Sequence, residues 1–88
     1  MSAKKLEEGL LVEQAGASAK LFTNEVGIWS LLVNIEAIKL EDSHSNIIFS
    51  GIIHTEDGRT ATRTLAFILQ TAASKLNQLA TELLYHAK

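Results

Sequence analysis

The most regular pattern of apolar positions lies between residues 65 and 87. Apolar side chains recur there every three or four positions, at Leu65, Ile68, Leu69, Ala72, Leu76, Leu79 and Leu83. This spacing is typical of one face of an α-helix. Hydroxyl and amide side chains dominate the opposite face, and they cost less to bury than charged groups. We therefore predict a helix over residues 65–87 with contacts on more than one side.

The clearest strand is predicted over residues 46–55. It contains five large apolar residues, which are Ile47, Ile48, Phe49, Ile52 and Ile53. β-branched and aromatic residues favour strands, and their presence on both alternating faces predicts a central strand that is covered on each side. Gly51 in its middle marks either a bulge or a place where another group packs close to the backbone.

Residues 24–40 fit two structures. Apolar side chains at helical spacing, with Thr23 as an N-cap, are compatible with a helix. The β-branched composition from Ile28 onward, and the polar cluster over residues 41–46 that follows, favour a strand. We favour the strand, and the helix stays open.

A third strand is predicted after residue 58. The pair Asp57-Gly58 is a strong hairpin signal, and threonines at 60, 62 and 64 alternate with other side chains up to Leu65. The sheet region therefore spans residues 28–65 as a three-stranded antiparallel meander.

The N-terminal region shows a weaker helical pattern. Over residues 4–16, the leucines at 6, 10 and 11 have the spacing of one helix face, and acidic and amide side chains occupy other positions. Gly16 stands where a helix would end. Residues 17–19 then read as a connector. The prediction is one α+β domain over residues 1–88, with a short N-terminal helix, the meander, and a long C-terminal helix packed on the sheet.

This domain has too few helices to cover both faces of its sheet, so the sequence predicts a homodimer or a higher homo-oligomer. The candidate interface residues on the last helix are Ile68, Leu76, Leu79 and Leu83. Trp29, the one tryptophan, is either a further interface anchor or a core residue.

Composition and charge narrow the functional classes. The chain has 88 residues, no cysteine and a formal net charge of −2, and nucleic-acid binders normally carry a basic excess. No apolar run reaches the 18 residues or so that a membrane helix needs, and residues 4–12 do not resemble a secretory signal. We expect a cytoplasmic protein whose partners are copies of itself and possibly another protein, and no membrane. The charge disfavours nucleic-acid binding, which would need the few cations to line up across the oligomer.

No motif in the sequence identifies a reaction. The five glycines are scattered, the histidines lack further ligands at fixed spacing, and no cofactor, metal or catalytic residue is assigned. We therefore expect a non-enzymatic interaction or regulatory module. The alternative is a small-molecule-binding protein or minimal enzyme with a site at the subunit boundary, for which His54 and Arg63 are the ligand candidates.

Overall fold

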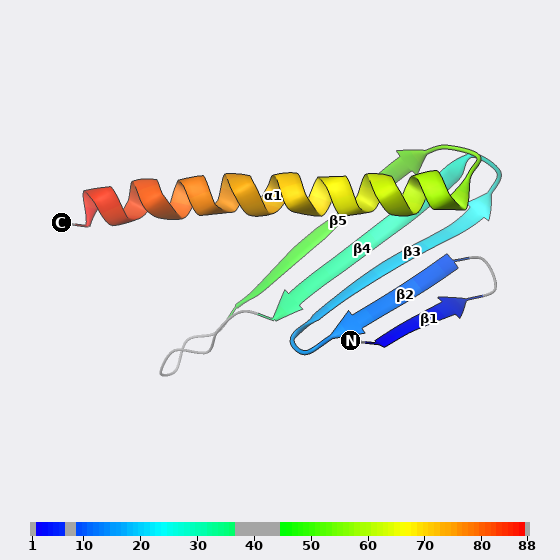
Figure 1. Ribbon diagram of the computed structural model, residues 1–88, viewed down its shortest axis with the longest axis horizontal. Coiled ribbons are helices and arrows are strands. Elements are labelled where there is room, and N and C mark those ends of the chain that lie inside the picture. Colours follow the sequence, from blue (N-terminus) through cyan, green and yellow to red (C-terminus); the bar gives the residue numbers. More distant parts are fainter. Residues whose placement is uncertain (1, 7–8, 37–44, 88) are drawn as a thin grey trace.

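The computed structural model describes residues 2–6, 9–36 and 45–87 of the chain. The elements are β1 (Ser2–Leu6), β2 (Gly9–Gln14), β3 (Ala17–Glu25), β4 (Ile28–Glu36), β5 (Asn46–His54) and α1 (Gly58–His86). The strands form one antiparallel sheet in sequence order, and α1 lies across one of its faces (Figure 1). The predicted α+β class, the antiparallel meander and the long C-terminal helix are confirmed. The strand number is wrong, because the sheet has five strands instead of three.

The predicted helix over residues 4–16 is wrong, because this region forms β1 and β2. Leu10 and Val12 point to the same face of the sheet as Leu21 and Ala19, their partners on β3. Strand alternation therefore explains these apolar positions better than a helical stripe does.

Residues 17–19, expected to be a connector, begin β3, and two glycines make this arrangement possible. Gly16, with a φ of 78°, turns the chain between β2 and β3 instead of ending a helix. Gly9 lies so close to β3 that a Cβ atom there would be 2.1 Å from the carbonyl oxygen of Leu21.

The ambiguous region 24–40 contains β4, which confirms the strand interpretation for Ile28–Glu36. A two-residue turn joins β3 to β4, and Gly27 adopts a φ of 83° in it. The predicted polar connection over residues 41–46 lies mostly outside the described residues. Residues 46–54 form β5 as predicted, but β5 is an edge strand and is not covered on each side.

The predicted third strand before Leu65 is wrong, because α1 already begins at Gly58. Asp57 is the N-cap of α1: its carboxylate accepts a hydrogen bond from the backbone N–H of Arg59 at 3.0 Å and another from the Thr60 hydroxyl at 2.9 Å. The hydroxyl of Thr62 donates to the carbonyl oxygen of Gly58, within the helix. The alternating threonines thus belong to the first turns of a helix.

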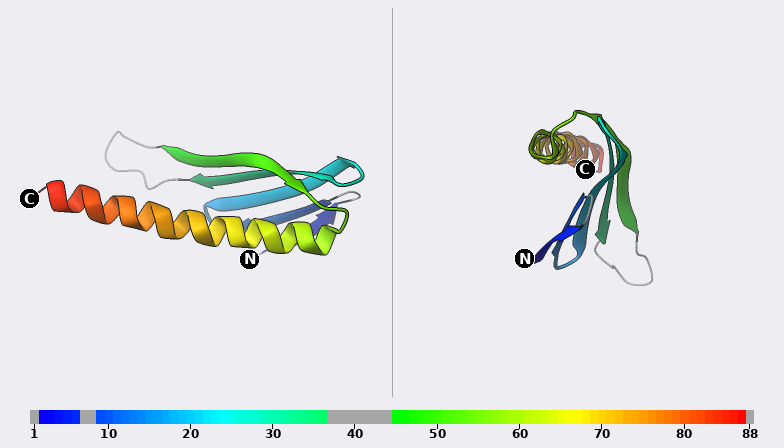
Figure 2. Two further views of the ribbon diagram at one scale, coloured as in Figure 1. Left: turned by 90° about the horizontal axis from the view of Figure 1, so that it is seen from above. Right: turned by 90° about the vertical axis from the view of Figure 1, so that its right-hand side faces the viewer.

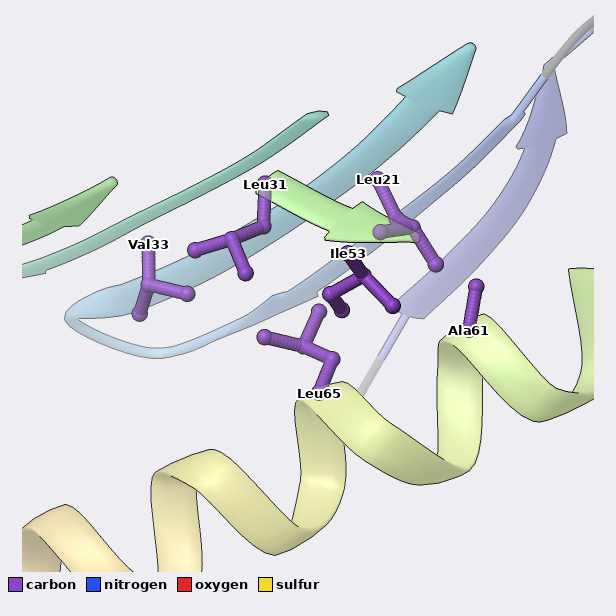
Figure 3. Packing of buried hydrophobic residues seen from close by; sticks show 6 residues of the cluster. All are labelled: Leu21, Leu31, Val33, Ile53, Ala61 and Leu65. Carbon is purple, nitrogen blue, oxygen red and sulfur yellow. The ribbon is translucent and has the colours of Figure 1, made fainter. Parts of the chain in front are cut away.

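The core lies between the sheet and the first half of α1. Its buried side chains are Leu21, Leu31, Val33, Ile53, Ala61 and Leu65 (Figure 3). Figure 2 shows α1 on one side of a curved sheet, with its C-terminal part projecting past the strands. The opposite sheet face has no covering layer among the described residues, and Ile48 and Ile52 there are 63% and 60% exposed.

Candidate functional site

Helix α1 is longer than the sheet surface that it covers. Its 29 residues correspond to about 43 Å at 1.5 Å per residue. Ala61 and Leu65 are buried and Ile68 is half-buried, whereas every residue from 73 to 87 is exposed. The second half of the helix therefore has almost no packing partner among residues 2–6, 9–36 and 45–87.

The apolar positions of α1 keep their spacing along this exposed half. Leu76, Leu79 and Leu83, here called the leucine stripe, continue the same helix face that packs on the sheet through Leu65 and Ala72. Their exposed fractions rise along the helix, from 40% at Leu76 to 61% at Leu79 and 70% at Leu83. The stripe thus has the apolar composition of a core-packing helix face, but in the described residues no other element packs against its end.

A mostly apolar groove of about 270 Å³ adjoins the start of the leucine stripe. The sheet contributes Val12, Ala19, Val33, Ile35 and Phe49 to its wall, and α1 contributes Leu69, Ala72, Ala73 and Leu76. Because Leu76 belongs to both the groove and the stripe, the two form one continuous apolar surface.

Two of the predicted interface residues lie within the chain's own core. Ile68 and Trp29 are half-buried and pack against the buried cluster. A Cβ atom at Gly58 would be 3.2 Å from the Trp29 ring, so glycine at this position leaves room for the indole against the first turn of α1. The three members of the leucine stripe are the predicted interface residues that lie beyond this core along the helix and are exposed.

The two ligand candidates of the alternative function lie on different elements. His54 is exposed at the end of β5 and Arg63 is exposed on α1, and neither lines a hollow described here. No group of three or more histidine, aspartate or glutamate side chains that could hold a metal ion occurs in the part of the chain that the structure describes.

The sequence did not reveal an open polar hollow of about 580 Å³ at one end of the sheet. Its polar lining consists of Glu13, Gln14, Ser18, Asn34 and Glu36. These side chains meet because the β2–β3 turn lies beside the end of β4, where the N–H of Glu36 donates to the Gly16 carbonyl at 2.7 Å. Without β3 in the prediction, nothing in the sequence brings these residues together.

The clearest electrostatic perturbation belongs to the helix cap. Hydrogen bonds, first from the backbone N–H of Arg59 and then from the Thr60 hydroxyl, hold the pKa of Asp57 below its ordinary value of 3.8. Asp57 is also close to the positive end of the helix dipole, which favours a carboxylate. The ionised carboxylate of Asp57 therefore stabilises the N-terminus of α1.

Searches for similar proteins found no match among protein-family models, curated proteins or solved structures. Within the described residues, none of the helices has the length and apolar character required to span a membrane.

Proposed function

We propose that this chain is a small, non-enzymatic interaction or regulatory module that works as a homo-oligomer. The observation that carries the proposal is the leucine stripe, which continues the core-packing face of α1 beyond the sheet. Contiguous apolar patches of this kind mark interaction sites in soluble proteins.

The stability of an isolated helix end supports this function. Residues 73–86 form about four turns of α1 in which every residue is exposed, and isolated helices of fewer than 12–15 residues are marginal in water. Packing of an apolar face is the usual source of helix stability in proteins. A second chain against the leucine stripe would supply that packing.

The composition around the stripe also suits an interface. Glu82 is the one charged residue between Leu76 and Leu84, and the cores of protein interfaces are depleted in charge. A second copy is favoured as the partner, because a net charge of −2 makes repulsion between copies small. A two-fold dimer also uses each leucine twice.

Size-exclusion chromatography with light scattering tests the proposal. The chain has a mass of 9.6 kDa, and we expect a particle of at least twice this mass at micromolar concentration. A mass of 9.6 kDa up to the highest soluble concentration would contradict the oligomeric function.

A further inference from the structure

Among the described residues, strand β5 is an edge of the sheet that lacks the usual protection against pairing. Exposed edges are normally protected by lysine, proline, bulges or short strands. The nine residues of β5 include no charged residue and no proline, and they pair with β4 without a register shift. The opposite edge, β1, has five residues, of which two are lysines. The two edge strands thus differ in composition, and in the described part of the chain β5 is the edge without charged residues.

The sequence of β5 is complementary to itself when two copies run antiparallel about Ser50. Ile48 then faces Ile52 of the partner subunit, and Ile47 faces Ile53 of the partner subunit. Cross-strand pairs of β-branched residues stabilise sheets. Isoleucine therefore meets isoleucine on both faces of the joined strands.

The same register explains why residue 51 is a glycine. A Cβ atom at Gly51 would have Leu31 Cδ2 at 3.9 Å as its nearest neighbour, which is an ordinary contact distance. The φ angle of Gly51 is not positive. Among the described residues, nothing therefore requires glycine at this position. Pairing about Ser50 places the Phe49 ring of one copy across from Gly51 of the partner subunit. An aromatic side chain over a cross-strand glycine covers the bare backbone and stabilises an edge.

We infer that β5 pairs antiparallel with β5 of a second copy, centred on Ser50, so that the two sheets join into one. This inference rests on the proposed homo-oligomer and names its contact. The C-terminal part of α1 projects past the strands on one side of the sheet (Figure 2). The strands of the second copy continue the sheet beyond β5, and the leucine stripe is a separate contact surface.

A cysteine at the symmetry centre tests the register. Opposite Cα atoms in antiparallel strands are about 4.5–5.5 Å apart, which is within disulfide range, and the chain has no other cysteine. We expect the variant Ser50→Cys to form a covalent dimer under mild oxidation, seen on a non-reducing gel. The matched control is Ser30→Cys, on the same sheet face but on the inner strand β4, and it should stay uncrosslinked.

A blocking substitution gives an independent readout. Ile52 is 60% exposed, so Ile52→Lys should leave the fold intact by circular dichroism and weaken dimerisation at least tenfold in sedimentation equilibrium. Leu32→Lys, on the same face of β4, is the control and should change dimerisation less.

The outcomes separate this inference from the proposed function. A dimeric wild-type protein whose Ser50→Cys variant does not crosslink, or whose Ile52→Lys variant dimerises normally, would overturn the β5 contact and leave the homo-oligomer standing. A wild-type protein that stays monomeric would overturn both.

Discussion

Replacing Leu79 and Leu83 together by serine should dissociate the oligomer without unfolding the subunit. Both side chains are more than half exposed in one copy, at 61% and 70%, so their loss removes little packing within the chain. Surface substitutions of this kind usually change stability by less than about 0.5 kcal/mol. The effect should therefore appear in association and not in folding.

The size of the effect follows from the area that these leucines leave uncovered. Complete burial of a leucine side chain is worth about 1.5–3 kcal/mol, so covering the exposed fractions of 61% and 70% contributes roughly 2–4 kcal/mol per copy. A two-fold dimer doubles this to roughly 4–8 kcal/mol, and each 1.4 kcal/mol is about tenfold in affinity. The double variant should thus dimerise at least about a thousandfold more weakly.

Sedimentation equilibrium over a range of concentrations measures this Kd, and far-UV circular dichroism checks the fold. The matched control is Leu84→Ser, because Leu84 is also 70% exposed but lies one step around the helix from the stripe. Equal weakening by Leu84→Ser, or an unchanged Kd in the double variant, would refute the assignment of the stripe as an interface.

Three further predictions concern the subunit itself. Leu65→Ala, at a side chain that is 6% exposed, should lower the free energy of unfolding by about 2–5 kcal/mol in urea titrations; an unchanged midpoint would contradict its core role. Gly9→Ala should lower the Tm, because the new methyl group would meet the Leu21 carbonyl oxygen; a normal Tm would argue against the tight contact between β2 and β3. Asp57→Ala should destabilise α1 at neutral pH, whereas Asp57→Asn should still cap it. Because folding lowers the pKa of Asp57, its ionic contribution is complete above the unfolded-state pKa and disappears as pH falls through the folded-state value. Thermal melts should therefore show that the Tm difference between wild type and Asp57→Ala shrinks as pH falls through that range. A difference that does not change with pH would contradict a role for the ionised carboxylate.

The sequence predicted the elements whose signals are local and repeated. The helical stripe from Leu65 to Leu83 and the β-branched run of β5 depend only on neighbouring residues, and both elements are present. The start of α1 was missed because an Asp-Gly pair suits a hairpin turn and a helix N-cap equally well. The hydrogen bonds of Asp57 and the burial of Ala61 against the sheet favour the helix. The burial of Ala61 depends on tertiary packing, which a local sequence pattern does not show.

The structure of the N-terminal half depends on contacts between strands. Its local sequence pattern therefore led to the wrong prediction of a helix. Gly9 weakens a helix in isolation, but its real constraint is the backbone of β3 close beside it. The polar hollow between the β2–β3 turn and the end of β4 needs the same register, so no motif could indicate it. The residues of the leucine stripe were predicted as interface residues, and the structure shows that they are exposed in one copy of the chain.

Symmetry determines how two β5 edges can pair. Two identical strands related by a two-fold axis along their length would place the same residue on opposite faces at the same level, which the pleat of a sheet does not allow. A closed pairing of two β5 edges is therefore antiparallel, with its axis perpendicular to the sheet. That axis keeps both copies of α1 on one face, running antiparallel to each other. The leucine stripes of the two copies then lie on the same face of the joined sheet, as contact surfaces separate from the β5 pairing.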